Sequence, residues 1–228
     1  MALLTNKNNE DEEAFVSDFH FPTSKKALVI FTRFPELGKC KTRLAATIGD
    51  ESALQVFKAL ITHTDSMVKR LSVDKFVYYT EAIHKNDTWD NELYQKRLQA
   101  GEDLGARMQN AFGDLFGFGY EKVVIIGTDL YDLNTTDLEK AFTALESSNF
   151  VVGPAEDGGY YLLGMRKLKP ELFRNKEWGA SSVLAQTLAN LEDESFVTLD
   201  VRNDIDYYED MKDIPSLNKL VGNIQSKE

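Results

Sequence analysis

The chain has few of the residues that several kinds of chemistry require. It contains one cysteine, Cys40, which excludes a disulfide within the chain. Its three histidines, His20, His63 and His84, lack the paired spacing of zinc sites. No apolar run approaches the roughly 20 residues of a membrane span, and residues 1–24 lack the apolar core of a secretory signal. We therefore expect a cytoplasmic protein without a membrane span or zinc centre, in which Cys40 is a small filler of its loop.

Positive charge is also scarce. Lys and Arg number 26 against 37 Asp and Glu, which gives a formal net charge of −11. Binding to nucleic acid needs a basic face that this composition does not supply, so we expect no nucleic-acid partner. With 228 residues, 43% of them hydrophobic, the chain is long enough for one well-packed domain. We predict a domain over residues 25–215, between a flexible acidic N-terminal tail (1–24) and a C-terminal tail (216–228).

The hydrophobic pattern alternates between a two-residue and a 3.6-residue period, which is typical of strands that alternate with helices. This pattern predicts an α/β fold. The predicted strands cover residues 27–34, 75–80, 122–128, 150–153, 160–165 and 196–201. The predicted helices cover residues 50–71, 103–116, 135–147 and 181–191, with Asp50 as the N-cap of the first and a short terminal helix within 203–213.

A basic loop, residues 33–44, directly follows the first predicted strand of this acidic chain. Its backbone N–H groups and cationic side chains at the edge of a sheet suit phosphate oxygens. The loop is not a P-loop, because Gly38-Lys39 is followed by Cys40 and the earlier glycine is missing. A solvated positive turn is the alternative. We assign phosphate binding to six residues of the loop: Arg33, Gly38, Lys39, Lys41, Thr42 and Arg43.

Two carboxylates follow the apolar segment 123–127. Asp129 appears where the predicted buried strand ends, and Asp132 lies three residues further on. In open α/β sheets ligands collect beyond the carboxyl ends of the strands, and Mg²⁺ or Mn²⁺ takes one or two protein carboxylates together with phosphates and water. Asp129 is therefore the stronger candidate for a metal ligand. Capping of the turn into the next helix is the alternative for both residues, and we favour it for Asp132.

A glycine-rich break, which contains Glu156, Asp157, Gly158 and Gly159, separates two predicted strands. Glycines there allow the backbone to approach a ligand closely. The Asp157-Gly158 pair is also a good hairpin turn without any function. As a second acidic pair at a strand end, Glu156 and Asp157 could complete a metal site or supply a general base.

Five segments in the same order resemble a family of bacterial glycosyltransferase-A-like transferases: residues 28–44, 101–108, 127–129, 153–161 and 178–182. That family is related to nucleotide-diphospho-sugar transferases and to the molybdenum-cofactor and phospholactate guanylyltransferases. The resemblance spans about residues 27–210. It implies a single-domain nucleotide-diphospho-sugar transferase fold, with a mostly parallel central sheet flanked by helices.

The resemblance also implies roles for particular residues. The basic loop would wrap a nucleotide's phosphates, Asp129 would hold a divalent metal, and Asp157 would be a second metal or acceptor contact. The segment 101–107 would close one side of the pocket, where Asp103 and Arg107 contact phosphate or substrate. For Arg107, an exposed charge on the helix surface is an equal alternative. The acceptor side would consist of Gly158, Gly159, Tyr160 and Trp178. After Asp129 the chain departs from the family pattern, because Leu130-Tyr131 replaces Cys-Pro.

Two further segments have simpler interpretations. Ser181 and Ser182 follow Trp178, but the second glycine of a nucleophile elbow is missing and no histidine lies nearby in the sequence, so serine hydrolase chemistry has no support. A helix-capping serine and a core tryptophan are open alternatives. Asp204 and Asp206 resemble the acidic turn that ends many nucleotide transferase domains, and we interpret them first as helix caps and second as site residues.

The leading hypothesis is a Mg²⁺- or Mn²⁺-dependent glycosyltransferase that uses a nucleotide sugar and a small-molecule acceptor. The first alternative is a guanylyltransferase-like nucleotidyltransferase, which would bind a nucleoside triphosphate and release pyrophosphate. The second alternative is a nucleotide-binding module without catalytic activity.

Overall fold

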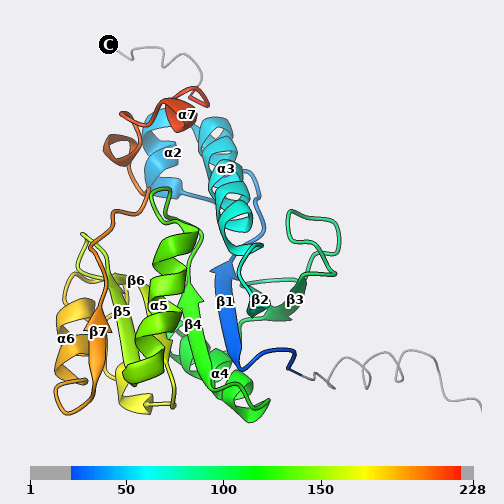
Figure 1. The fold of residues 1–228 in the computed structure, drawn as a ribbon. Coiled ribbons are helices and arrows are strands. Elements are labelled where there is room, and N and C mark those ends of the chain that lie inside the picture. The colour runs from blue at the N-terminus through cyan, green and yellow to red at the C-terminus, as the bar shows by residue number, and fades with distance from the viewer. Residues whose placement is uncertain (1–21, 222–228) are drawn as a thin grey trace, which may run out of the picture.

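The structure, a computed structural model, describes residues 22–221, which form a seven-stranded sheet with helices on both faces (Figure 1). The strand order is β3-β2-β1-β4-β6-β5-β7, and among the described strands β6 alone runs antiparallel to its neighbours. The strands are β1 (Lys26–Thr32), β2 (Asp74–Tyr79), β3 (Tyr94–Leu98), β4 (Lys122–Ile126), β5 (Phe150–Pro154), β6 (Tyr160–Met165) and β7 (Phe196–Thr198). This is the mostly parallel α/β sheet that the sequence predicts.

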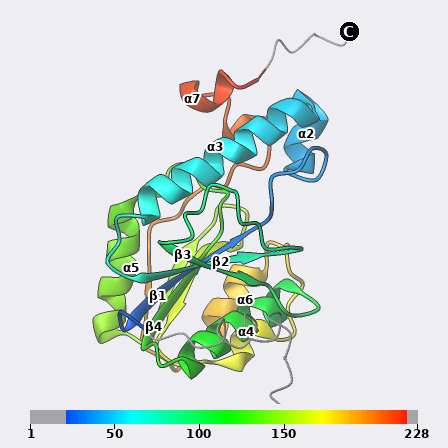
Figure 2. The same ribbon diagram turned by 90° about the vertical axis from the view of Figure 1, so that its right-hand side faces the viewer.

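The helices divide between the two faces of the sheet. They are α2 (Thr42–Ile48), α3 (Asp50–Val68), α4 (Leu104–Gly117), α5 (Thr135–Ser147), α6 (Val183–Ala189) and α7 (Pro215–Asn218), with 3₁₀ turns η1 (Pro170–Phe173) and η2 (Tyr208–Asp210). One apolar cluster joins the sheet to α3 and α5, and a second joins its other face to α4, η1 and α6. Figure 2 shows these two layers on opposite sides of the strands.

The central strands form because their side chains are apolar on both faces, as a covered parallel sheet requires. Four successive residues of β1, Ala27 to Ile30, have no exposed surface. The helix α5 begins at a capping box, in which the Asn134 side chain accepts from the Asp137 N–H and the Asp137 carboxylate accepts from the Asn134 N–H. Asn134 therefore caps this helix, and the capping role that we favoured for Asp132 is wrong. The predicted cap Asp50 is likewise wrong, because Gly49 precedes α3 and Asp50 is its first residue.

Strand β3 and helix α2 are among the elements that escape the sequence-based prediction. Strand β3 lies at the edge of the sheet and reads Tyr-Gln-Lys-Arg-Leu, in which Tyr94 alone is buried, so it lacks an apolar pattern. Helix α2 has seven residues and begins inside the basic loop. Several predicted elements also end early in the structure, because a periodic pattern locates the centre of an element better than its ends.

The folded part extends beyond the predicted boundary at residue 215. Leu217 of α7 is 1% exposed and packs with α2 and the first half of α3 in a third apolar cluster. The predicted C-terminal tail therefore begins too early. The segment 203–213, in which we predicted a short helix, contains only the 3₁₀ turn η2. Apart from residues 22–24, the predicted N-terminal tail lies outside the described residues. Within residues 22–221, no helix combines the length and the apolar character that a membrane crossing requires.

Candidate functional site

The centre of the candidate site is an ion-pair cluster beyond the ends of β1 and β4. The Lys41 ammonium lies 2.6 Å from Asp129 Oδ1 and 2.9 Å from Asp206 Oδ1. The Lys41 side chain is 6% exposed, whereas those of Asp129 and Asp206 are 45% and 32% exposed. Arg43 Nη1 donates to the second oxygen of Asp206 at 3.2 Å. The basic loop thus faces the carboxylate that follows β4, as the sequence-based hypothesis requires.

Burial opposes the charge on Lys41, but the neighbouring carboxylates decide its protonation state. Burial lowers the pKa of the ammonium, and the charges of Asp129 and Asp206 outweigh this effect, so the pKa of Lys41 is raised above its ordinary value. Lys41 is therefore a permanent cation at neutral pH. Its backbone has φ 48° and ψ 50°, a left-handed conformation that is uncommon outside glycine. This conformation directs the side chain back toward the end of β4, and strained backbone of this kind is enriched at functional sites.

The basic loop is organised by contacts within itself. Arg33 Nη1 donates to the Lys39 carbonyl at 2.7 Å, and this hydrogen bond links the first residue of the loop to its middle. The Cys40 sulfur accepts from the Glu36 N–H at 3.3 Å, and the residue is 3% exposed. Burial raises the pKa of the Cys40 thiol, which keeps it protonated. This geometry agrees with the predicted role of Cys40 as a small filler.

Asp204 and Asp206 reach the site on a C-terminal segment, residues 200–206, that crosses the ends of β4 and β5. The Ile205 N–H donates to the Asp129 carbonyl at 2.9 Å. Arg202 anchors the segment through ion pairs with Asp132 at 3.1 Å and Asp137 at 2.6 Å. The Asp210 carboxylate, rather than Asp204 or Asp206, caps the turn η2. Our first interpretation of Asp204 and Asp206 as helix caps is therefore wrong, and both face the site.

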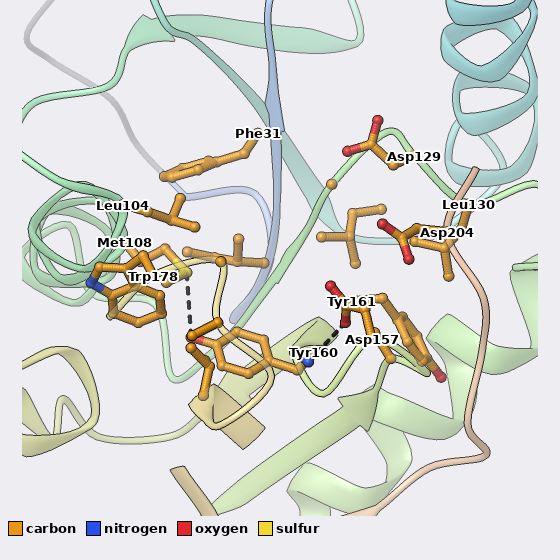
Figure 3. Close-up of a pocket in the computed structure, with 18 residues that line it drawn as sticks. Phe31, Leu104, Met108, Asp129, Leu130, Asp157, Tyr160, Tyr161, Trp178 and Asp204 are labelled. Atoms are coloured by element: carbon orange, nitrogen blue, oxygen red, sulfur yellow. Dashed lines mark hydrogen bonds between the residues drawn. The ribbon is translucent and has the colours of Figure 1, made fainter. Parts of the chain in front are cut away.

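Two cavities meet at Asp129. The first, which we call the phosphate cavity, has a volume of about 260 Å³ and four cations in its lining. Its lining residues are Arg33, Lys39, Lys41, Thr42, Arg43, Phe57, Asp129 and Asp206. The second, the aromatic cavity, has a volume of about 300 Å³ and lies over the ends of β4 and β6 (Figure 3). Residues that characterise its wall are Phe31, Leu104, Met108, Tyr160, Tyr161 and Trp178, with the carboxylates of Asp129, Asp157 and Asp204.

Close approaches at two glycines build the wall of the aromatic cavity. A Cβ atom at Gly105 would lie 2.5 Å from the Trp178 ring and 2.5 Å from the Phe173 carbonyl oxygen, so glycine allows Trp178 to pack against the start of α4. A Cβ atom at Gly158, whose φ is 88°, would lie 2.2 Å from the Ser181 carbonyl oxygen. Glycine at these two positions thus lets the segment 178–181 close over the cavity.

One carboxylate of the aromatic cavity, Asp204, has a shifted pKa. Burial, followed by the negative charges of Asp206 and Asp157, raises the pKa of Asp204 to about 6. Asp157 Oδ1 accepts from the Gly159 N–H at 2.8 Å, which fixes the turn between β5 and β6. Figure 3 shows the Asp129, Asp157 and Asp204 side chains along one side of the cavity, opposite Trp178, Leu104 and Met108. The cavity is consequently negative on one side and apolar on the other.

The donor set suits a hard cation that also takes oxygen ligands from a substrate. Over residues 22–221, no group of three or more His, Cys, Asp and Glu side chains is placed to hold a metal ion. Asp129 and Asp157 still supply two carboxylates on one cavity wall. One or two protein carboxylates, completed by phosphate oxygens and water, are what Mg²⁺ commonly uses. The residues present therefore fit Mg²⁺ or Mn²⁺ together with a phosphorylated ligand.

Several predicted site residues lie outside both cavities. Asp103 is the N-cap of α4, with its carboxylate accepting from the Ala106 N–H at 2.7 Å, and Arg107 donates to the Gly101 carbonyl at 3.1 Å. These bonds order the loop before α4. Gly38, Gly158 and Glu156 line neither cavity, and Glu156 is exposed. The remaining predicted residues line one cavity or both: Arg33, Lys39, Lys41, Thr42, Arg43, Asp129, Asp157, Gly159, Tyr160 and Trp178.

Sequence reasoning missed part of the aromatic wall. Phe31 and Met108 belong to a strand and a helix whose periodic pattern marks them as core, and Tyr161 sits in an apolar strand. No local signal separates a cavity-lining aromatic residue from a core residue. The acidic turn at Asp204 and Asp206 was visible as a pattern, but its partner Lys41 lies 165 residues from Asp206 in the chain.

Solved structures of other proteins share this fold. A structure from Desulfovibrio desulfuricans G20, named "putative nucleotide-diphospho-sugar transferase", has a TM-score of 0.77 and 29% sequence identity, over 81% of this chain and 84% of that one. The 4-diphosphocytidyl-2C-methyl-D-erythritol synthase of Anaerococcus prevotii DSM 20548 has a TM-score of 0.52 and 12% identity, over 81% and 92% of the two chains. CMP:2-keto-3-deoxy-manno-octonic acid synthetase, in complex with CTP, has a TM-score of 0.50 and 10% identity, over 86% and 99%.

The likeness to the Desulfovibrio structure bears out the relation to nucleotide-diphospho-sugar transferases that the sequence indicates, and all three structures share the fold predicted from the sequence. A comparison with curated proteins found no match. A family model matches residues 62–180, more than half of the chain, and we conclude that the protein belongs to the family described as "Uncharacterized protein conserved in bacteria (DUF2064)".

Proposed function

We propose that this protein is a transferase that uses a nucleotide-activated donor, with a nucleotide sugar as the leading donor. The observation that carries the proposal is the meeting of the two cavities at Asp129. One cavity is lined by four cations and the other by aromatic residues and carboxylates. A donor diphosphate suits the first, and the group that receives the sugar suits the second. The Desulfovibrio structure, which resembles this chain along most of its length, has a name that agrees with this donor class.

The phosphate cavity explains how an acidic protein would hold a nucleotide. Lys41 is buried and oriented by Asp129 and Asp206, so its side chain would lose little conformational entropy when an anion binds. Lys39 and Arg43 are 55% and 61% exposed and can move toward phosphate oxygens. Lys41 and Arg43 both donate to the Asp206 carboxylate, so a diphosphate would compete with Asp206 for these two cations. The loop thus provides one fixed cation and several adaptable ones.

Asp129 and Asp157 are the residues that would hold Mg²⁺ or Mn²⁺. When bound, such a cation offsets the negative charge that develops on a departing diphosphate. Asp157 would also be the general base that accepts a proton from the acceptor hydroxyl, because it lines the aromatic cavity and its carboxylate is oriented by the Gly159 N–H. Glu156 is the second candidate base. The turn between β5 and β6 would have to rearrange before its exposed side chain reached the acceptor.

Nucleotidyl transfer is the alternative, and the number of cations in the phosphate cavity favours it. Four basic residues could hold three phosphates as well as two. The acceptor would then attack the α-phosphorus of a nucleoside triphosphate and release pyrophosphate. Two structures of this fold carry cytidylyl chemistry or CTP in their names, and at 10% and 12% identity they support the fold alone.

Product analysis separates these reactions. A thermal-shift screen of nucleotides and nucleotide sugars, with and without Mg²⁺ or Mn²⁺, would identify the donor, because a ligand of the native state raises the apparent stability. Incubation with that donor and a pool of acceptors should release nucleoside diphosphate. Release of pyrophosphate would establish nucleotidyl transfer instead, and binding without turnover would leave a nucleotide-binding module.

The role of Asp129 has its own test. Asp129→Asn should abolish metal-dependent nucleotide binding while the fold is kept, because the amide is a weaker ligand for a hard cation. Asp132→Asn is the matched control: Asp132 lies in the same loop but pairs with Arg202 and lines neither cavity. Titration calorimetry in the presence of Mn²⁺ should show no nucleotide binding for Asp129→Asn and an unchanged nucleotide affinity for Asp132→Asn. Equal affinities for both variants would remove the metal role.

The basic loop can be tested with a ligand pair. Lys39→Ala combined with Arg43→Ala should weaken the binding of a nucleoside diphosphate far more than that of the corresponding nucleoside, because charge-assisted hydrogen bonds are lost only with the first. Titration calorimetry of both ligands measures the difference. If the two affinities fall by the same factor, the loop does not recognise phosphate.

A further inference from the structure

The two cavities that meet at Asp129 are opposite in charge. The phosphate cavity contains Arg33, Lys39, Lys41 and Arg43. Of the residues in the described part of the chain that line the aromatic cavity, none is Lys, Arg or His, and three are aspartates. An anion is therefore favoured on one side of Asp129 and repelled on the other. The polarity of the site distinguishes the two halves of any substrate that fills it.

A bound divalent cation would not reverse this polarity. Asp129 and Asp157 would hold it, and it would offset the charges of those two carboxylates. The Asp204 carboxylate would remain without a cation on the cavity wall, since the Lys41 ammonium is in contact with Asp129 and Asp206. The aromatic cavity would still disfavour a second anion.

Apart from the Trp178 indole N–H, the side chains of the aromatic cavity offer hydrogen-bond acceptors rather than donors. The Tyr160 hydroxyl points to the Met108 sulfur at 3.7 Å (Figure 3), and the Tyr161 hydroxyl donates to the Asp200 carbonyl at 3.1 Å. The Gly159 N–H is already used by Asp157. Ionised carboxylates only accept hydrogen bonds. A ligand that contacts the carboxylate side of this cavity must therefore bring its own donors, as hydroxyl or ammonium groups do.

The opposite wall is apolar and flat. Trp178, Leu104 and Met108 lie across from the carboxylates, and the Trp178 ring is held against Gly105 (Figure 3). Such a surface favours a ligand with an apolar or ring face, because aromatic side chains bury large areas and stack on flat groups.

We propose that the acceptor of this enzyme is an uncharged hydroxylated compound or an amine with an apolar face, and that phosphorylated and carboxylated acceptors are excluded. This inference rests on the proposed function, because it assigns the aromatic cavity to the group that receives the donor's sugar.

Four aromatic fragments test the charge preference without any turnover. Benzyl alcohol, benzylamine, benzoate and benzyl phosphate share a ring that fits the wall and differ in charge. Indole ¹⁵N-labelled protein gives signals from its two tryptophans, Trp89 and Trp178, and the variant Trp178→Phe assigns them. Trp89 is buried in the core and serves as an internal control. We expect the alcohol and the amine to shift the Trp178 signal at concentrations at least about tenfold below those that the two anions require.

A variant that neutralises two of the three cavity carboxylates tests the cause. Asp157→Asn combined with Asp204→Asn should allow benzoate to shift the Trp178 signal, with circular dichroism as the check that the fold is kept. Asp132→Asn removes one carboxylate charge outside the cavity and should leave benzoate excluded. Anions that shift Trp178 in the unchanged protein as readily as the amine would overturn the proposal, as would continued exclusion of benzoate from the double variant. A free nucleoside that shifts Trp178 would assign the cavity to the base and would overturn it too.

Turnover distinguishes this inference from the proposed function. If the donor releases nucleoside diphosphate only with phosphorylated or carboxylated acceptors, the proposed function stands and the acceptor class is wrong. If nucleotide binds but no acceptor produces turnover, the proposed function fails and the assignment of this cavity to an acceptor fails with it, even where the fragment preference is observed.

Discussion

Lys41 should stabilise the protein through its two carboxylate partners, and Lys41→Met tests this. Methionine keeps an unbranched side chain, one atom shorter than that of lysine, and removes the charge. At an effective dielectric constant of about 20, each contact near 3 Å is worth roughly 5 kcal/mol before desolvation. Burial of the ammonium cancels most of this energy, and solvent at the 45% and 32% exposed side chains of Asp129 and Asp206 weakens what remains. We expect a net loss of about 2 kcal/mol in the free energy of unfolding.

Lys39→Met is the matched control for this change. It removes the same charge from the same loop, but Lys39 is 55% exposed and pairs with Glu36, which is 50% exposed. Its cost should be below about 0.5 kcal/mol. Urea unfolding followed by circular dichroism measures both variants, with an unchanged slope as evidence that the change lies in stability. A Lys41→Met midpoint that coincides with that of Lys39→Met would refute the reasoning.

Two more predictions concern packing and pH. Gly105→Ala should destabilise the protein by about 2 kcal/mol or more, because the new Cβ would meet Phe173 and Trp178 at 2.5 Å. Gly113→Ala in the same helix is the control: its Cβ would meet one atom at 3.9 Å, and it should stabilise the protein by about 0.5 kcal/mol. Equal melting temperatures for the two variants would contradict this prediction. Burial raises the pKa of Asp74, but hydrogen bonds from Thr23 and Tyr120 outweigh it and leave the pKa below the usual 3.8. The stability that these bonds contribute is therefore present above pH 3.8 and is lost as the pH falls through the folded-state pKa. The melting temperatures of wild type and Asp74→Asn should accordingly differ most at pH 7 and converge toward pH 3, and a constant difference would show that the carboxylate is not responsible.

The local pattern of the sequence predicts most of the architecture. Among the described residues, apolar runs and helical spacing located six of the seven strands and the helices α3, α4, α5 and α6, because each of these elements buries a face that a short window of sequence displays. The strand β3 was missed for the same physical reason: at the edge of the sheet it buries Tyr94 alone and shows no pattern. The basic loop and Asp129 were also visible, since both directly follow apolar strands and a parallel sheet gathers such loops at one edge.

Only the tertiary structure decided which residues complete the site. Among the loop cations, it buries Lys41 rather than Lys39, a difference that their equal charges cannot reveal. It also places Asp206 against Lys41 across 165 residues, and it brings Asp204 beside Asp157. Ion pairs and cavity walls form where segments that are distant in the sequence come together, and the packing of the whole sheet decides where that happens. Composition and periodicity describe only residues that are neighbours along the chain.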